Sequence, residues 1–285
     1  MEGRGPLSTL ARLLRLWRLY AKLDLFFVTR SFRTFVVWYL SDIILSIATV
    51  SGMLLLAERF AGIGVWSKEQ VLFLLGYAAT VGGLLEIFFG FNIAFISRRL
   101  GRGQFDHTLL QPQPVWMALL TEGFTPFAGS ATLAPGIALL AWSVIHLHVA
   151  VSPGWLAMLL LSLAASAAVA LAFQYALGSL AFWAPRAADE INSSSANLLH
   201  QLKTFPLDGL GPVLLGGLLS ALPVGFVAWA PCRSLLGLTP GFWAALATPL
   251  AALLLGALAA LLFAKGMRHY ARTGSQRYSS FGHRR

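Results

Sequence analysis

The segment RRLGRGQFDHTLLQPQP, residues 98–114, is a polar and basic interruption between two long apolar stretches. Two glycines near its start are typical of a helix C-terminus, and two prolines near its end prevent a helix from continuing. Gln104 to Leu110 therefore has room for one or two helical turns. An ordinary polar connection is the simpler alternative to a functional helix.

Helical spacing predicts how the side chains of this short helix are arranged. Phe105, Leu109 and Leu110 fall on roughly one face. The residues expected to point away from that face are Gln104, Asp106 and His107.

The composition on both sides of the segment is that of a polytopic membrane protein. Of 285 residues, 57% are hydrophobic and only 11% are charged, with a mean hydropathy of +0.72. The net charge is +10, but most of the basic residues gather before residue 34, within 98–102 and after residue 264. By the positive-inside bias these three regions share the cytoplasmic side, so both termini are expected there. The basicity is thus topological, and we expect no nucleic-acid partner.

Hydropathy predicts membrane-spanning helices, because about 20 apolar residues cross the hydrocarbon core. Before the first span, Leu7 to Lys22 alternates apolar and basic faces, which predicts an amphipathic helix lying on the lipids of the cytoplasmic leaflet. The predicted spans are Thr34 to Ala57, Val71 to Ile96, a third that begins between Pro126 and Pro135 and ends near Ile145, Trp155 to Trp183, and Phe242 to Ala264. A further span lies between the fourth and the last. The whole chain is therefore expected to be all-α with six spans.

Polar side chains within these apolar segments are the candidates for a transport path. An unpaired charge at membrane depth costs on the order of 2.5–3.5 kcal/mol on insertion scales, so Glu86 must face protein, water or a cation. A structural ion pair explains Glu86 as well as a transport role does. The remaining candidates for the path lining are Asn92, Ser193, Asn197 and His200.

The sequence lacks the motifs of familiar catalytic chemistry. It contains no G-x-x-x-x-G-K-[ST], so we expect no ATP hydrolysis by this chain and no cofactor bound to it. His146 and His148 have no third ligand nearby, so no metal site is predicted. The chain itself is therefore not expected to be an enzyme.

Three motifs, in order, give the chain a family resemblance. The first is Arg102, Gly103, Asp106, Leu109, Leu110 and Pro112; the second lies within Phe205 to Gly237; the third is KGMRHYARTGS, Lys265 to Ser275. Together they resemble the six-span permease subunits of ABC-type exporters, the ABC-2-like family. The resemblance covers most of the chain from about Phe35 to Ser275.

The resemblance implies a function, partners and a location. It implies export at a permease dimer interface, driven by two separate ATPase subunits that carry ATP and magnesium. None of the motifs identifies the substrate, but an apolar interface path suits an amphipathic or lipid-like one. The second permease chain would be identical or homologous, and the expected location is a bacterial inner membrane. The loop helix would contact the ATPase through Arg98, Arg99, Arg102, Gln104, Phe105, Asp106, His107, Leu109 and Leu110.

The fifth span can be placed in two ways. Hydropathy alone predicts a loop over 185–206 and a span over 207–230, whereas the resemblance implies a span over 187–205 followed by a re-entrant helical pair over 207–231. We favour the second, because segments rich in Gly and Pro are tolerated at membrane depth when they are shielded from lipid. The chain then divides into an N-terminal segment (1–33), a transmembrane domain (34–264) and a basic tail (265–285).

Two other classes of function fit the same residues. An integral membrane enzyme could use Glu86 and the polar face of residues 189–204 as a cleft, although motif chemistry is missing. An ion-coupled carrier could use Glu86 as its proton site and would need no ATPase. Six spans in one chain are few for such a carrier unless it forms a dimer.

Overall fold

The computed structural model of the chain describes residues 6–59, 65–127 and 129–274. Residues 1–5 of the N-terminal segment and 275–285 of the basic tail, which sequence analysis assigned to the cytoplasm, lie outside the described residues. Within the described ranges the regular structure is helical. Its helices are α1 (Pro6–Arg30), α2 (Phe32–Arg59), α3 (Lys68–Gly101), α4 (Phe105–Leu109), α5 (Val115–Thr121), α6 (Ser130–His146), α7 (Pro153–Ser179), η1 (Leu180–Phe182), α8 (Pro185–Leu202), α9 (Pro212–Ser220), η2 (Gly225–Trp229), α10 (Ala230–Leu235) and α11 (Phe242–Thr273).

Four helices are long and apolar enough to cross a membrane. They are α2, α3, the run of α7 with η1, and α11, and the pair formed by α9 with η2 and α10 makes a fifth candidate if it counts as one span. The predicted boundaries of these four lie within three residues of the observed ones, except at the polar end of α3 and at α11. There α11 continues as one helix to Thr273, through basic residues that sequence analysis assigned to a separate tail.

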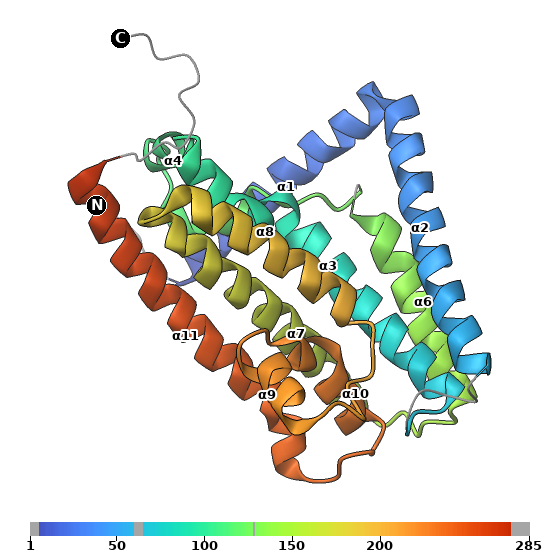
Figure 1. The fold of residues 1–285 in the computed structure, drawn as a ribbon. Coiled ribbons are helices and arrows are strands. Elements are labelled where there is room, and N and C mark those ends of the chain that lie inside the picture. The colour runs from blue at the N-terminus through green and yellow to red at the C-terminus, as the bar shows by residue number, and fades with distance from the viewer. Residues whose placement is uncertain (1–5, 60–64, 128, 275–285) are drawn as a thin grey trace.

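The bundle is built around α3, which packs against α6, α7 and α8 (Figure 1). Its residues Phe73, Tyr77 and Val81 are fully buried in the main apolar cluster. Glycines allow α3 and α6 to approach closely, since a Cβ atom on Gly83 would lie 2.5 Å from the Cα atom of Leu133. By contrast, α1 and α2 meet at a corner on one side of the bundle, and α2 stands largely apart from its core (Figure 1).

A kink divides α3 at Gly90, whose backbone has φ 34° and ψ −121°. That positive φ is a conformation that glycine adopts without steric cost. Near the kink, the Thr125 backbone N–H donates to the carbonyl of Ile87 (2.9 Å) and the Thr125 hydroxyl donates to that of Glu86 (3.2 Å). The segment between α5 and α6 therefore satisfies carbonyls beside the break in α3.

The polar helix α8 runs antiparallel to α3. Near its start Asp189 accepts a hydrogen bond from Ser97, while Lys203, just past its end, packs at Gly82, about four turns back along α3. The chain then reaches the far end of the bundle, where Asp208 accepts a hydrogen bond from the Trp66 indole (2.5 Å). Residues 185–208 thus extend along the bundle beside its most buried helix.

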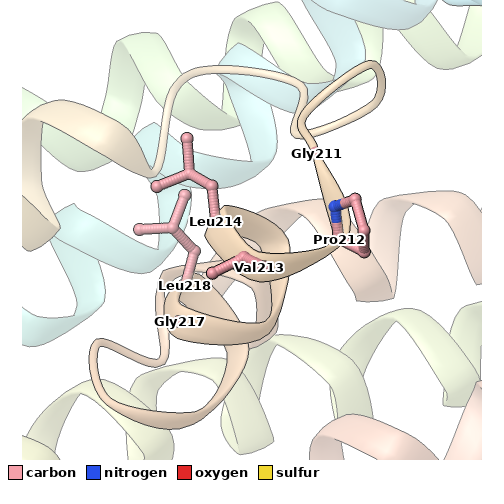
Figure 2. Close-up of a pocket in the computed structure, with 6 residues that line it drawn as sticks. All are labelled: Gly211, Pro212, Val213, Leu214, Gly217 and Leu218. Atoms are coloured by element: carbon pink, nitrogen blue, oxygen red, sulfur yellow. The ribbon is translucent and has the colours of Figure 1, made fainter.

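The next segment is a bent helical pair at that far end. The helix α9 meets η2 and α10 at 80°. None of the residues of α9 is buried, and Pro212, Val213, Leu214 and Leu218 form an apolar hollow on its surface (Figure 2). In a membrane this surface suits lipid or another apolar chain.

Candidate functional site

The short helix α4 is presented at the end of the bundle opposite α9 and α10 (Figure 1). The helix α3 ends through hydrogen bonds from the Gly103 N–H to Leu100 (3.0 Å) and from the Gln104 N–H to Arg99 (2.9 Å). Gly103 has φ 69°, which only glycine adopts without strain. This turn reverses the chain, and α4 follows at once as a single short helix.

One aromatic side chain anchors α4 in the bundle. Phe105 is fully buried and packs edge-to-face against Phe182 (5.7 Å between ring centroids) and Tyr270 (5.7 Å). Such pairs contribute about 0.5–1.5 kcal/mol each beyond the area that they bury. Because Phe182 ends the α7 segment and Tyr270 lies on α11, α4 is fixed to two long helices at once.

A second contact ties α4 to α11. The hydroxyl of Tyr270 donates to the Asp106 carboxylate, with 2.5 Å between the two oxygens. Hydrogen bonds to an ionised carboxylate are shorter and roughly twice as strong as neutral ones. This hydrogen bond joins α4 to the end of the last long helix.

The exposed surface of α4 differs from the predicted one. Phe105, Leu109 and Leu110 do not share a face, because Phe105 is buried whereas Leu110 is 82% exposed and Leu109 40%. Leu110 keeps helical backbone angles, and its N–H donates to the Asp106 carbonyl. It follows Phe105 by five residues, which places it about 140° around the helix from Phe105 rather than on the same face. The residues available to a partner are Arg102, Gln104, His107, Leu109 and Leu110, with Asp106 partly exposed.

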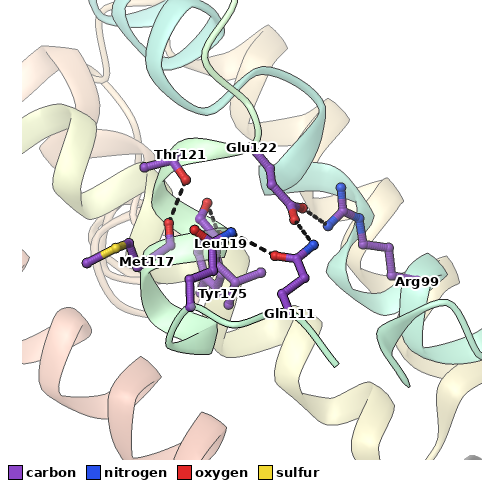
Figure 3. A network of polar contacts seen from close by, with 8 residues as sticks. Arg99, Gln111, Met117, Leu119, Thr121, Glu122 and Tyr175 are labelled. Carbon is purple, nitrogen blue, oxygen red and sulfur yellow. Dashed lines mark hydrogen bonds and ion pairs between the residues drawn. The ribbon is translucent and has the colours of Figure 1, made fainter. Parts of the chain in front are cut away.

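The two arginines that end α3 make contacts inside the chain. Arg98 lies 3.8 Å from the Asp189 carboxylate at the start of α8. Arg99 forms a 2.5 Å ion pair with Glu122, which also accepts a hydrogen bond from the Gln111 amide at 2.8 Å (Figure 3). These bonds fix the loop on both sides of α4, so the two arginines position α4 as well as adding positive charge beside it.

The predicted path residues do not lie together. Glu86 lines a cavity between α1, α2 and α3, on the side of α3 that faces Asp42 of α2. Asn197 and His200 are on the exposed side of α8, with Ser193 half-buried, and none of these three lines that cavity. The side chain of Asn92 lies outside the described part of the structure.

Sequence reasoning missed several charged groups that the fold brings near Glu86. Asp24 and Asp42 line the same cavity, although α1 and α2 lie far from Glu86 in the chain. Lys203 is buried, and its ammonium lies within electrostatic reach of Glu86. Only the amphipathic pattern of α8 could have indicated Lys203, because a lysine after a span ordinarily reads as a boundary residue.

Comparisons with known proteins place this arrangement in a family. Neither the search of curated proteins nor that of solved structures finds a match. The family described as "ABC-2 family transporter protein" matches residues 28–274, which include every helix from α2 to α11. The chain therefore belongs to the ABC-2 family of transporter proteins, as an integral membrane permease component that works with ATP-binding cassette subunits.

Proposed function

We propose that the chain is the six-span permease subunit of an ATP-driven exporter and that α4 is the helix on which an ATPase subunit pushes. The observation that carries the proposal is an exposed apolar tip, formed by Leu109 and Leu110, at the end of a helix that Phe105 and Asp106 fix to the core. An exposed apolar tip suits a groove on a partner. A firmly braced base would transmit the movement to α7 and α11.

The charges support a cytoplasmic position for the end of the bundle that carries α4. Arg98, Arg99 and Arg102 lie there, and Arg268 and Arg272 lie near it on α11, next to Tyr270. By the positive-inside bias that end faces the cytoplasm, where ATP is available. The proposed setting is a bacterial inner membrane, with both termini in the cytoplasm and α1 lying along the lipid surface.

The course of α8 supports six crossings. Four crossings are the long apolar helices, and α6 and the 185–208 segment supply the other two. Since Asp208 lies against Trp66, the chain has already reached the outer end before α9 begins. The bent pair of α9 with η2 and α10 then enters and leaves on the same side, which supports the re-entrant assignment over a span at 207–230.

The exposed side of α8 supports a permease dimer. Ile191 and Leu198 are each 48% exposed, and the polar residues Asn197 and His200 are exposed beside them. A spanning helix with such a mixed surface must face another chain or a water-filled path. We therefore propose that α8 meets a second permease chain, with an amphipathic or lipid-like substrate passing near this interface.

The test is co-purification with a substitution at the exposed tip. We expect Leu110→Asp to weaken capture of the ATPase subunit by at least tenfold, because it places a charge where an apolar side chain fills a groove, a change of about 1.4 kcal/mol or more. The measurement is quantitative pull-down of the tagged chain from native membranes in mild detergent, with ATP hydrolysis assayed in the eluate.

The matched control is Ala271→Asp, which adds the same charge to an exposed position of α11 at the same end of the bundle. It should retain the ATPase subunit. Equal capture by both variants and the parent chain would place the contact elsewhere. A parent chain that purifies without any P-loop subunit would overturn the exporter proposal altogether.

A further inference from the structure

A cavity of about 590 Å³ lies between α1, α2, the kink of α3 and the connection from α5 to α6. Its volume falls within the range of about 300–1,000 Å³ that is typical of small-molecule sites. Aromatic side chains form much of the wall. They are Tyr20, Phe27, Phe35, Trp38, Tyr39 and Phe124.

Four carboxylates share this cavity. Asp24, Asp42, Glu86 and Glu122 all line it, and the described lining residues include no lysine, arginine or histidine. For an apolar cavity beside a membrane span this is an unusual amount of charge, because a carboxylate at membrane depth is costly without water or a counter-ion. The negative charge therefore calls for a positive occupant.

Two of the four carboxylates are occupied by protein groups. Asp24 accepts a hydrogen bond from the backbone N–H of Phe127 at 2.8 Å. Glu122 is paired with Arg99 at 2.5 Å. Both contacts hold the cavity wall in place. Because these two carboxylates already have protein partners, they contribute less to binding a positive occupant than the other two do.

Asp42 and Glu86 are both exposed and lie on facing helices, α2 and α3. Lys203 compensates part of the Glu86 charge, and Thr132 gives that carboxylate a side-chain hydrogen bond. Asp42 has no comparable cation among the described lining residues. The Asp42 and Glu86 pair therefore keeps an excess of negative charge within a wall of aromatic rings.

We propose that this cavity binds an amphipathic organic cation. Its positive group lies between Asp42 and Glu86, and its apolar body packs against Trp38 and Phe124. Aromatic faces attract cations by about 0.5–2 kcal/mol per contact, more as the group is desolvated, so the wall and the carboxylates select the same ligand chemistry. Transport of this cation rests on the exporter proposal, whereas its binding to the cavity does not.

The experiment compares two ions of nearly equal shape and opposite charge. The probes are tetraphenylphosphonium and tetraphenylborate, each measured by equilibrium dialysis against the full chain in detergent with its co-purified subunits, and corrected with empty micelles. We expect the cation to bind at least tenfold more tightly than the anion. Asp42→Asn and Glu86→Gln should each weaken binding of the cation by at least fivefold.

The matched control is Glu58→Gln, which removes one carboxylate from an exposed ion pair with Lys68 far from the cavity. It should leave the affinity for the cation unchanged. Trp38→Leu tests the aromatic wall without altering its charge. It should lower the affinity for the cation more than the affinity for the anion. If Glu86→Gln does not fold, Asp42→Asn and the comparison of the two ions still test whether the cavity binds a cation.

Two results would overturn the cavity proposal. One is equal affinity for the anion, which would indicate an apolar or lipid-like ligand. The other is unchanged affinity for the cation in Asp42→Asn. Failure of the exporter proposal looks different, since the cation would still bind to a chain that co-purifies with no ATPase.

Discussion

At the residue scale, Asp208 holds together three segments that are remote in the chain. Its carboxylate accepts hydrogen bonds from the indoles of Trp66 (2.5 Å) and Trp229 (2.6 Å) and pairs with Arg233, which lies over the Trp229 ring. Loss of a hydrogen bond to a charged group costs about 1.5–3 kcal/mol, more when it leaves a partly buried cation unpaired. Asp208 therefore connects the segments that meet at the end of the bundle opposite α4.

We expect Asp208→Asn to lower the midpoint of thermal unfolding by roughly 5 °C, the shift for a loss of about 2 kcal/mol in a domain of this size. The amide keeps the shape of the carboxylate but not its charge, so Arg233 loses its counter-ion. The measurement is a thermal unfolding scan of the purified chain in detergent. Glu58→Gln breaks an exposed pair instead and should shift the midpoint by no more than about 1 °C; equal shifts would contradict the role of Asp208.

Contacts of this kind could not be predicted from the sequence. Asp208 is separated from Trp66 by 142 residues, and Asp106 from Tyr270 by 164. A polar residue near an apolar run reads simply as a boundary, because nothing local indicates its partner. The same reason explains why Asp42 was not placed beside Glu86.

At the element scale, prediction succeeded where length and hydropathy decide. The long apolar helices α2, α3 and α7 were found close to their observed bounds. Prediction failed for α4, where Phe105 and Leu110 were assigned to one face although five residues separate them along the helix. Only the packing shows that Phe105 is buried and Leu110 exposed. For α8, polar composition left two assignments open. Our proposal that residues 185–208 cross the membrane rests on Lys203 at Gly82 and on Asp208 at Trp66, both toward the other end of α3.

The contact between α3 and α6 depends on the absence of a side chain. At Gly83 a Cβ atom would meet the Leu133 backbone at 2.5 Å, so the two helices must separate to admit it. Overpacking of this kind costs about 1–3 kcal/mol. We expect Gly83→Ala to lower the thermal midpoint by several degrees, measured by thermal unfolding in detergent.

Gly256→Ala provides the matched control within α11. A Cβ atom there meets nothing within 4 Å, and alanine is the better helix former by about 1 kcal/mol. That variant should keep or raise the midpoint. If Gly83→Ala also raised it, helix propensity would outweigh packing at this site, and the glycine contact would not hold α3 to α6.

At the scale of the whole molecule, the end that carries α4 and the side that holds the cavity differ in how they are packed. At the end that carries α4, contacts of Phe105, Asp106 and Arg99 connect this end to η1, to α11 and to Glu122 after α5. On the side formed by α2 and the cavity, the described residues in the apolar stretch of α2 are not buried within this chain. On the exporter proposal, a push on α4 moves the helices that it contacts relative to α2, and the cavity, which Glu122 and residues of α2 both line, then changes its width.

Such a movement requires a partner chain against which the bundle can shift, and the exposed side of α8 is where we expect it. Leu198→Cys should form a disulfide with the corresponding permease chain when membranes are treated with a mild oxidant, because Leu198 is 48% exposed on that side. The native Cys232 is buried, so it contributes little background. The measurement is a band of twice the monomer mass on non-reducing gels.

The control is Leu253→Cys on α11, at a position that is 70% exposed among apolar neighbours. This residue should face lipid, so the variant should stay monomeric. Cross-linking at Leu253 but not at Leu198 would move the interface from α8 to α11, and the mixed polar side of α8 would then have to line a path within a single chain.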